Sequence, residues 1–221
     1  MNYGIELKNI TKYYGNNRVI NNLTMNIERS KLTILKGRSG SGKTTLLNIM
    51  GLLDTGYRGE LVFDGRPTEG LREKDFESIR RKKCGFVFQS VALIPDMTAY
   101  ENIEFALKLS NYEGDHDSRI NELLSIVSLE KRKKHMPCEL SGGEAGRIAI
   151  LRAIAHKPEF LFCDEPTGAL DTGSGLIIMD LFKNLVKEEG ITIVMTTHDN
   201  NLMEMGDSVY ELNDGSINRV R

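Results

Sequence analysis

The 221-residue chain, with 40% hydrophobic and 27% charged side chains, has the composition of an ordinary globular protein, long enough for one large domain or a core with a small lobe. Its formal net charge of -2 gives no general attraction to nucleic acid or anionic lipid, so we expect no nucleic-acid partner. The scattered Cys84, Cys138 and Cys163 form no zinc spacing, which favours reduced thiols in a cytosolic protein. The polar N-terminus shows no secretory signal, and no apolar run approaches the ~20 residues that span a bilayer.

The first predicted elements are strands, which dominate residues 3–36. Hydrophobic residues alternate partly in IELKNI and clearly in NLTMNI, and KLTILK is a short apolar strand before a glycine-rich segment. The pattern then predicts a helix over 44–53, a strand running into an Asp-Gly turn around 60–66, a charged helix over 73–83 and a strand over 84–89.

The middle of the chain favours helix over 97–136, with hydrophobic residues spaced by three and four. Beyond it we predict a helix after LSGGE, a strand at EFLFCDEP, an amphipathic helix over 174–189, a strand over 191–199 and a short hairpin-like end. Strands alternating with helices predict a parallel sheet with helices on both faces. The helical block interrupts this pattern, so we expect it to form an inserted lobe.

The segment GRSGSGKTT fits the phosphate-loop pattern G-x-x-x-x-G-K-S/T, and it lies between a predicted strand and a predicted helix, as that motif requires. Its glycines let the backbone curl so that N–H groups face an anion, and the helix N-terminus adds partial positive charge. A turn that only joins strand to helix is the alternative, which the complete pattern disfavours. The candidate nucleotide-binding residues are Gly37, Arg38, Ser39, Gly40, Ser41, Gly42, Lys43, Thr44 and Thr45.

Three side chains of this loop have separate expected roles. Lys43 supplies a charge for the β- and γ-phosphates, Thr44 offers a hydroxyl to a magnesium ion, and Thr45 offers one near the α-phosphate. A phosphate loop alone does not distinguish kinases, GTPases, DNA-repair ATPases and transport ATPases.

Two acids end the apolar strand FLFCDEP. The strand delivers Asp164 to its C-terminal edge, where α/β sheets bind ligands, and there it is placed to hold magnesium. We expect Glu165 to point in another direction because side chains alternate along a strand, and to polarise an attacking water. A solvated turn is the alternative. The pair indicates hydrolysis rather than transfer to a substrate hydroxyl.

Two more polar residues end predicted strands. Gln89 closes GFVFQ, and its amide is a candidate for contact with magnesium-bound water and the nucleophile, although a structural role is equally open. His198 ends IVMTTHD, where it can donate to a γ-phosphate and hold the water and Glu165 in line. A lone histidine is often structural, but its place after a third strand with a polar end favours function.

The segment LSGGE, residues 140–144, precedes a strong helix. Ser141 can cap that helix and Glu144 can complete a capping box, yet this explains neither Gly142 nor Gly143. The glycines leave bare N–H groups at a positive helix end, which predicts a second anion site. If the inserted lobe projects away, these groups can reach only a nucleotide held by another copy, in a two-fold homodimer joined by two ATP molecules.

In these motifs the chain resembles the ATP-binding cassette (ABC) ATPases. GRSGSGKTT resembles their Walker A, FLFCDEP their Walker B, LSGGE their signature, Gln89 the Q-loop and His198 the switch histidine. GALD resembles the D-loop, which implies that Ala169, Leu170 and Asp171 lie at the dimer interface. Tyr14 matches the aromatic that stacks on adenine, with Tyr13 as the alternative. The resemblance covers essentially the whole chain, with the motifs in family order.

The resemblance implies an α/β fold: a P-loop NTPase core with an N-terminal antiparallel β subdomain and an inserted helical subdomain. The single domain would span 1–221, with core and β subdomain at 1–89, helices at 90–145 and the core continuing over 146–221. ATP and Mg²⁺ are the implied cofactors, the metal being held by Thr44, Gln89 and Asp164. The implied partners are a second copy and a separate transmembrane permease, at the cytoplasmic face of the membrane.

FVFQSVALIPDMTAYENI and DEPTGALD resemble the lipoprotein-release, macrolide-export and antimicrobial-peptide branch of the family. This implies export or extraction of a peptide, lipoprotein or hydrophobic compound through the permease. A mechanotransmitting ATPase of the cell-division type is the alternative. A DNA-repair ATPase is disfavoured because no coiled coil separates Gln89 from LSGGE, and a small-molecule kinase because of LSGGE and Glu165.

Two positions depart from the usual pattern of the family, and two basic runs lie outside the motifs. Glu144 replaces the usual signature glutamine, and its carboxylate should repel a triphosphate unless the capping box turns it away. Gly146 follows in the first turns of the helix, at a cost of about 1 kcal/mol relative to alanine. The basic runs 80–83 and 131–134 are expected to be solvated helix ends rather than contacts to lipid headgroups.

Overall fold

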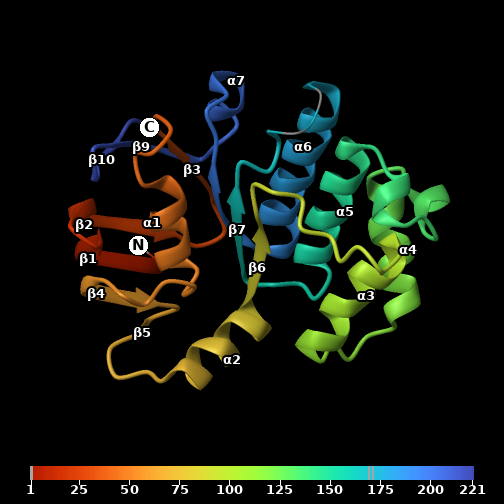
Figure 1. The fold of residues 1–221 in the computed structure, drawn as a ribbon, viewed down its shortest axis with the longest axis horizontal. Helices are drawn as coiled ribbons and strands as arrows, with labels where there is room; N and C mark the ends of the chain where they lie inside the picture. Colours follow the sequence, from red (N-terminus) through yellow and green to blue (C-terminus); the bar gives the residue numbers. More distant parts are fainter. Residues whose placement is uncertain (1, 169, 171) are drawn as a thin grey trace.

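The computed structural model describes residues 2–168, 170 and 172–221, and these residues form two sheets with helices packed around them (Figure 1). The four-stranded sheet has the spatial order β2 (Asn17–Glu28), β1 (Tyr3–Tyr14), β4 (Arg58–Phe63) and β5 (Arg66–Pro67). The six-stranded sheet has the order β10 (Ser216–Arg219), β9 (Ser208–Asn213), β3 (Leu32–Lys36), β8 (Thr192–Thr196), β7 (Phe160–Asp164) and β6 (Cys84–Val87).

The four-stranded sheet is antiparallel and comes from the N-terminal strands that the alternating pattern predicts. Its inward side chains, such as Ile5 and Leu7 of β1, are fully buried. The predicted Asp-Gly turn joins β4 to β5, where Asp64 and Gly65 have φ values of 53° and 73°. Two successive positive φ values are characteristic of a tight hairpin turn, and Asp-Gly is among the dipeptides that tolerate them.

In the larger sheet, the strands β9, β3, β8, β7 and β6 run parallel, and β10 adds an antiparallel edge. β7 is buried along its whole length, which explains its continuous apolar sequence. Its side chains alternate between two hydrophobic clusters: Phe160 and Phe162 face one, Leu161 and Cys163 the other. The sheet is therefore covered on both faces, as the strand–helix alternation predicts.

One face of the sheet packs on α1 (Lys43–Met50) and the N-terminal sheet, and the other on α5 (Gly142–Ile154) and α6 (Thr172–Glu189) (Figure 1). Consequently α1 and α5, the helices that follow the two glycine-rich motifs, lie on opposite faces of one sheet. The remaining helices are α2 (Glu73–Lys83), α3 (Ala99–Ser110), α4 (His116–Ile126) and α7 (Asn200–Met203), with 3₁₀ turns at Glu130–Arg132 and Pro137–Glu139.

The predicted helical lobe corresponds to α3, α4 and the two 3₁₀ turns, which lie together at one side of the molecule (Figure 1). Its buried residues, including Ile103, Leu107 and Leu124, belong to the same hydrophobic cluster as Ile148 of α5. The lobe is thus packed on the core through α5, and the domain boundaries at 89 and 145 stay predictions. In the described part of the chain, no helix is both long and apolar enough to cross a bilayer.

Candidate functional site

The predicted phosphate loop joins β3 to α1 and places the helix N-terminus at the C-terminal edge of the sheet. Gly42 caps α1 with a φ of 99°, in the left-handed region that favours glycine. A Cβ at Gly37 would lie 2.4 Å from the carbonyl oxygen of Leu212, so only glycine allows the loop to approach β9 this closely. The first turn of α1 carries no acidic residue.

Lys43 folds back over the loop and is largely buried. Its Nζ donates hydrogen bonds to the carbonyl oxygens of Gly37 at 2.9 Å and Arg38 at 3.0 Å, which places the ammonium inside the curl. The buried hydroxyl of Ser41 has no hydrogen-bond partner among the described residues. A cationic group and an unsatisfied donor in one loop fit an anionic ligand.

A cavity of about 750 Å³ opens at this loop. It is lined by Gly37, Ser39 and Gly40 of the loop, by His198 after β8, and by Glu211 of β9. The topology therefore brings two strand ends and the phosphate loop to one cavity. Among the described residues that line it, none comes from 140–144, so the second glycine-rich motif lies outside the first site.

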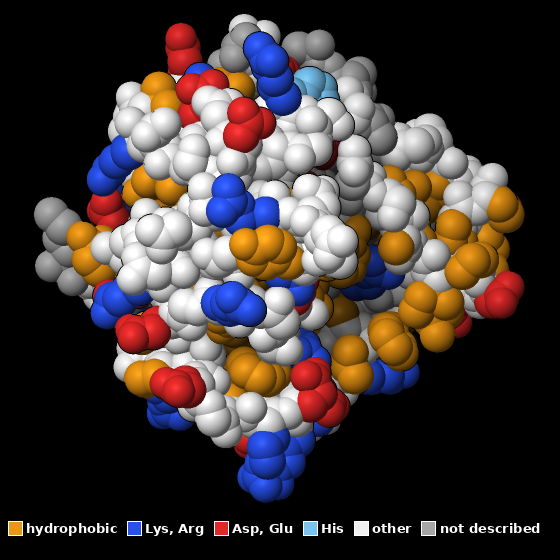
Figure 2. Space-filling model, turned by 60° about the vertical axis from the view of Figure 1, so that its left-hand side comes forward, with side chains coloured by type: hydrophobic (Ala, Val, Ile, Leu, Met, Phe, Trp, Pro, Cys, Tyr) orange, Lys and Arg blue, Asp and Glu red, His pale blue; other side chains and the backbone are white. Residues whose placement is uncertain are grey.

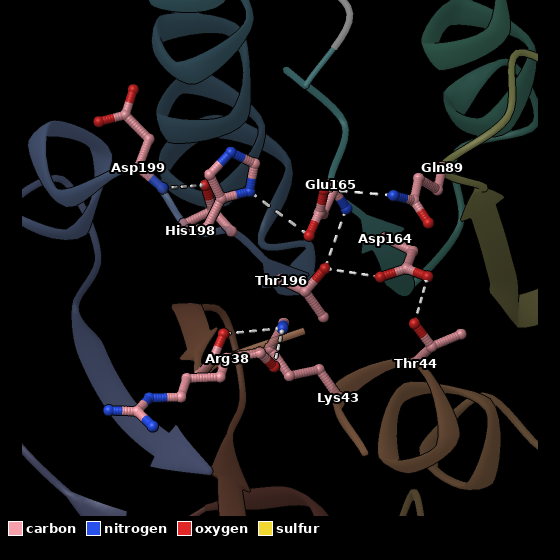
Figure 3. Close-up of polar contacts among 11 residues, drawn as sticks. Arg38, Lys43, Thr44, Gln89, Asp164, Glu165, Thr196, His198 and Asp199 are labelled. Carbon is pink, nitrogen blue, oxygen red and sulfur yellow. Dashed lines mark hydrogen bonds and ion pairs between the residues drawn. The ribbon is translucent and has the colours of Figure 1, made fainter. Parts of the chain in front are cut away.

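Asp164, at the end of β7, is buried and accepts a hydrogen bond at each carboxylate oxygen. The Thr44 hydroxyl donates to Oδ2 at 2.7 Å, and the Thr196 hydroxyl donates to Oδ1 at 2.7 Å (Figure 3). Thr196 also accepts from the backbone N–H of Glu165 at 2.9 Å, so one hydroxyl links both acids. Its position at the end of the buried β8 strand was the available signal for this residue, which sequence reasoning missed.

The backbone conformation of Glu165, and not side-chain alternation along β7, sets the direction of its side chain. The prediction that alternation would direct it was therefore wrong. β7 ends at Asp164, and Glu165 has a φ of 48°, in the left-handed region. This conformation turns its carboxylate between two polar side chains (Figure 3). Oε2 lies 3.4 Å from Nε2 of Gln89, and Oε1 lies 3.5 Å from Nδ1 of His198.

Gln89 and His198 both lie beyond the strands that were expected to contain them, since β6 ends at Val87 and β8 at Thr196. The loop over 88–98, which contains Gln89, is anchored at its C-terminal part by the buried Asn102 of α3. The Asn102 amide donates to the carbonyl of Met97 at 2.9 Å, and its Oδ1 accepts from the N–H of Ile94 at 2.8 Å. The loop therefore connects the site to the helical lobe.

The donor set at the sheet edge fits a magnesium ion. The Thr44 hydroxyl and an Asp164 oxygen lie 2.7 Å apart, and both are hard oxygen ligands. Magnesium usually takes one or two protein ligands and completes its shell with phosphate oxygens and waters. The described residues contain no group of three or more His, Cys, Asp or Glu side chains that could hold a metal ion.

Tyr14, at the end of β1, is held beside α1 by two residues that sequence reasoning missed. Its hydroxyl donates to Oδ2 of Asp54 at 2.8 Å, and Oδ1 of Asp54 accepts from Nζ of Lys12 at 2.6 Å. That Nζ lies 4.8 Å from the Tyr14 ring centroid and is buried, whereas Tyr14 is 51% exposed. One ring face therefore rests on a cation, and much of the ring stays accessible to a ligand.

The electrostatics of this cluster follow from the same contacts. Burial raises the pKa of Tyr14, and the hydrogen bond to Asp54 adds to the rise. Burial alone would raise the pKa of Asp54, but hydrogen bonds from Lys12, Tyr14 and the Gly56 backbone outweigh it, so the pKa is lowered. Asp54 is thus an anion that fixes both neighbours. Tyr13, the alternative aromatic, pairs with Arg18 in the sheet ladder.

The LSGGE segment forms the N-terminus of α5 with the predicted capping box. The Ser141 hydroxyl accepts from the N–H of Glu144 at 3.2 Å, and Glu144 Oε2 accepts from the N–H of Ser141 at 2.8 Å. The carboxylate of Glu144 is therefore turned back onto the helix end. Among the described residues, nothing lies within 4 Å of a Cβ built on Gly142, so the space before this turn is open.

Arg132 also contacts Glu144, its Nε donating to Oε1 at 2.7 Å, and sequence reasoning missed this pair. The basic run 131–134 is therefore not only a solvated end, because Lys133 also pairs with Asp117 at 3.1 Å. The same holds for the run 80–83, where Arg80 pairs with Glu73 at 2.6 Å.

Leu170 packs next to the start of α5. A Cβ at Gly146 would lie 3.1 Å from Leu170 Cδ2, so glycine at this position allows the close approach. The expected helical cost of Gly146 thus has a packing reason. Ala169 and Asp171, which the sequence assigns to the same motif, lie outside the described residues.

Comparisons with known proteins agree with this geometry. The sequence pattern of the ABC transporter family matches residues 20–168. The "uncharacterized ABC transporter ATP-binding protein MJ1508" of Methanocaldococcus jannaschii is 41% identical over 218 residues, which cover 96% of this chain and 97% of that protein. The macrolide export ATP-binding/permease protein MacB of Escherichia coli is 39% identical over 218 residues, 96% of this chain and 34% of that larger protein.

Solved structures give the same result. A dimeric structure of the ABC transporter cassette MJ0796 superposes with a TM-score of 0.91 at 40% identity, covering 98% of this chain and 99% of that one. A dimeric post-hydrolysis state of the same cassette bound to ADP and Pi superposes with a TM-score of 0.90 at 39% identity, with the same coverage. With its phosphate loop and acidic strand end, the chain is an ATP-binding and ATP-hydrolysing subunit, and it belongs to the ABC transporter family.

Proposed function

We propose that this chain drives export or extraction of a peptide, lipoprotein or hydrophobic compound through a separate membrane permease, by hydrolysing ATP in a sandwich of two copies. The observation that carries the hydrolytic part is the cluster at the sheet edge. There Glu165 lies between Gln89 and His198, next to Asp164 and the phosphate loop.

In this proposal the chain's own residues divide the chemistry. Glu165 accepts a proton from the attacking water, and His198 holds that water and the γ-phosphate in line. Lys43 and the loop N–H groups stabilise the developing phosphate charge. Thr44 and Asp164, with Gln89 through water, would hold Mg²⁺, which neutralises charge on the β- and γ-phosphates.

Adenine would stack on the accessible face of Tyr14. The Asp54 hydrogen bond fixes the orientation of the ring, which supports Tyr14 over Tyr13 for this role. The buried Lys12 ammonium under the ring supports the same assignment.

The second copy would complete the site. Ser141, Gly142 and Gly143 lie outside the nucleotide cavity of their own chain, and the space in front of Gly142 is open. In a two-fold pair each LSGGE segment would face the partner's γ-phosphate, with Leu170 near the interface. The two solved structures of the related cassette MJ0796 are themselves described as dimers.

The sandwich is tested with Glu165→Gln, which keeps the side-chain size but removes the base. The variant should lose about 10²- to 10⁴-fold in kcat and form a stable dimer with ATP on gel filtration. As a control, the variant Glu165→Gln/Lys43→Ala should remain monomeric. A Glu165→Gln protein that stays monomeric at saturating ATP would contradict the sandwich.

The permease would dock in a groove of about 330 Å³ between α2 and α3. Leu53, Phe86 and Leu109 give it apolar walls, and Arg80 and Arg81 give it cationic groups. Figure 2 shows hydrophobic side chains gathered on the right-hand part of the face that it views, beside a hollow with Lys and Arg side chains. The related MacB combines an ATP-binding part and a permease in one protein. A chain docked this way would be peripheral, at the cytoplasmic face of the membrane.

Docking is tested by co-purification of the tagged chain from membranes. Leu109→Asp in the groove should abolish recovery of a membrane permease, because it places a charge on an exposed apolar contact. Ile126→Asp, at an exposed apolar position of α4 outside the groove, serves as the matched control. Equal recovery with the two variants would show that the permease binds elsewhere.

A further inference from the structure

Glu144 places a carboxylate in the first turn of α5, the turn that carries the signature glycines. Both of its oxygens are occupied, Oε1 by Arg132 Nε at 2.7 Å and Oε2 by the Ser141 N–H at 2.8 Å. The hydrogen bond from Arg132 is the largest of the effects that lower the pKa of Glu144 to about 2. Glu144 is therefore a fixed anion with a dedicated counter-ion.

In the proposed sandwich, this helix end faces the triphosphate of the partner copy. An acid in the first turn stabilises the isolated helix, but the same negative charge repels a bound phosphate. The capping box alone directs the carboxylate and leaves its charge in place. The cation at Arg132 offsets that charge, because opposite unit charges in contact largely cancel at a distance.

Arg132 is held at this position by its own segment. It ends the 3₁₀ turn Glu130–Arg132, in which its N–H donates to the carbonyl of the buried Leu129 at 2.8 Å. Its carbonyl accepts from the N–H of His135 at 2.9 Å, and the His135 carbonyl accepts from Ala99, the first residue of α3, at 2.9 Å. The guanidinium is thus carried by a turn fixed to the helical lobe.

We propose that Arg132 is a positioning residue for ATP hydrolysis: it neutralises Glu144 and holds it in the capping box, so that the N–H groups of Gly142 and Gly143 meet the partner's nucleotide without a competing anion. This inference rests on the proposed sandwich dimer. It also explains how a glutamate serves at the end of the signature motif, since the pair presents no net charge to the nucleotide.

The test measures ATP-dependent dimer formation in the Glu165→Gln background by light scattering, as the ATP concentration at half-maximal dimer. Adding Arg132→Ala should raise this concentration about 10-fold, which corresponds to 1.4 kcal/mol. In a Glu144→Gln background the same Arg132→Ala change should move it by less than about 2-fold, because no carboxylate remains to be neutralised. The exposed neighbour Lys131→Ala removes an equal charge from the same turn and is the matched control.

A purely structural role for Arg132 predicts an equal defect of Arg132→Ala in both backgrounds, and that result would overturn the proposal, as would no defect at all. The defect should also shrink in 1 M salt, where charges are screened within about 3 Å. If Arg132→Ala fails to fold, Arg132→Gln replaces it, and thermal unfolding verifies each variant. A Glu165→Gln parent that does not dimerise with ATP would instead refute the sandwich itself, which separates the two failures.

Discussion

The helices α1 and α5 both begin after glycine-rich motifs, but their first turns use opposite devices. Gly42 starts α1 in a left-handed conformation, with no side-chain cap in the described structure and no acid in the first turn, and Lys43 follows directly. Ser141 starts α5 with a side-chain cap, and Glu144 stands in the first turn. The first helix end is thus left bare for an anion, whereas the second is capped and carries an anion of its own.

In the proposed sandwich, a positive helix end therefore serves a phosphate in two ways. At α1 no side chain caps the helix end in the described structure, and Lys43 adds positive charge. At α5 an arginine from a distant turn cancels the acid that the capping box requires. The first arrangement is contained in one short segment, but the second depends on the helical lobe, since Arg132 lies outside α5.

The largest effect on ATP hydrolysis is expected at the N-terminus of α1. Lys43→Ala removes the charge that the loop holds, so ATP hydrolysis should fall by at least about 100-fold, as for other preorganised electrostatic groups. Phosphate release under steady-state conditions measures it. The variant should keep the thermal stability of a folded protein. Turnover that is unchanged within error would refute the assigned phosphate site.

The next prediction places an acid in the first turn of α1, as Glu144 stands in the first turn of α5. Thr45→Glu places a carboxylate in the first turn of α1, where Lys43 is already directed to the loop carbonyls. At ~6 Å and an effective dielectric constant of ~20, one added charge costs about 3 kcal/mol, so ATP affinity should fall roughly 100-fold. Titration with a fluorescent ATP analogue measures this loss, and Thr45→Gln is the neutral control. Equal affinity of the two variants would show that α1 tolerates an acid without a counter-ion.

A smaller effect is expected at the adenine end of the same site. Asp54→Asn removes the negative charge that holds Tyr14 and Lys12. The KM for ATP should therefore rise about 2- to 10-fold, as for loss of one hydrogen bond, while kcat changes little. Steady-state kinetics separate the two constants. A KM for ATP that is unchanged would remove Asp54 from the site. A large loss of kcat would place it in the hydrolytic machinery instead.

The smallest effect concerns the capped end and its dependence on pH. The pKa of Glu144 is lowered from 4.5 to about 2 in the folded protein, so its ionisation stabilises the fold above the unfolded value. That contribution is lost as the pH falls from about 4.5 towards about 2. The difference in unfolding free energy between wild type and Glu144→Gln should therefore narrow over this range in urea titrations. A difference that stays constant with pH would exclude the ion pair as its source.

The sequence predicted the fold because its local signals agree with its tertiary packing. The charged helix over 73–83 has the predicted bounds, and the Asp64–Gly65 turn joins β4 to β5 as expected. The buried strand β7 ends at Asp164, which the topology brings next to Thr44. Motifs of fixed spacing thus located most of the candidate site, because each lies at a strand or helix end that the pattern marks.

The residues that were missed act through contacts between distant segments. Thr196 lies 31 residues from Glu165, and Asp54 lies 40 residues from Tyr14, and in neither pair does the sequence contain a periodic signal that joins the partners. Arg132 sits within a basic run whose composition does not show which member turns inward. The left-handed backbone of Glu165 was missed for a different reason, since strand alternation predicts a direction only while the strand continues.

The left-handed backbone conformation of Glu165 couples thermal stability to the proposed ATP turnover at a single position. A residue with a side chain is strained at a φ of 48°, whereas glycine adopts it freely. Replacement of Glu165 by glycine would remove both the proposed base and the backbone strain. Replacement by alanine would remove the base but keep the strain. The carboxylate of Glu165, the proposed base, is therefore held in place by the rest of the fold against its own local preference. Selection for higher thermal stability would favour its replacement by glycine.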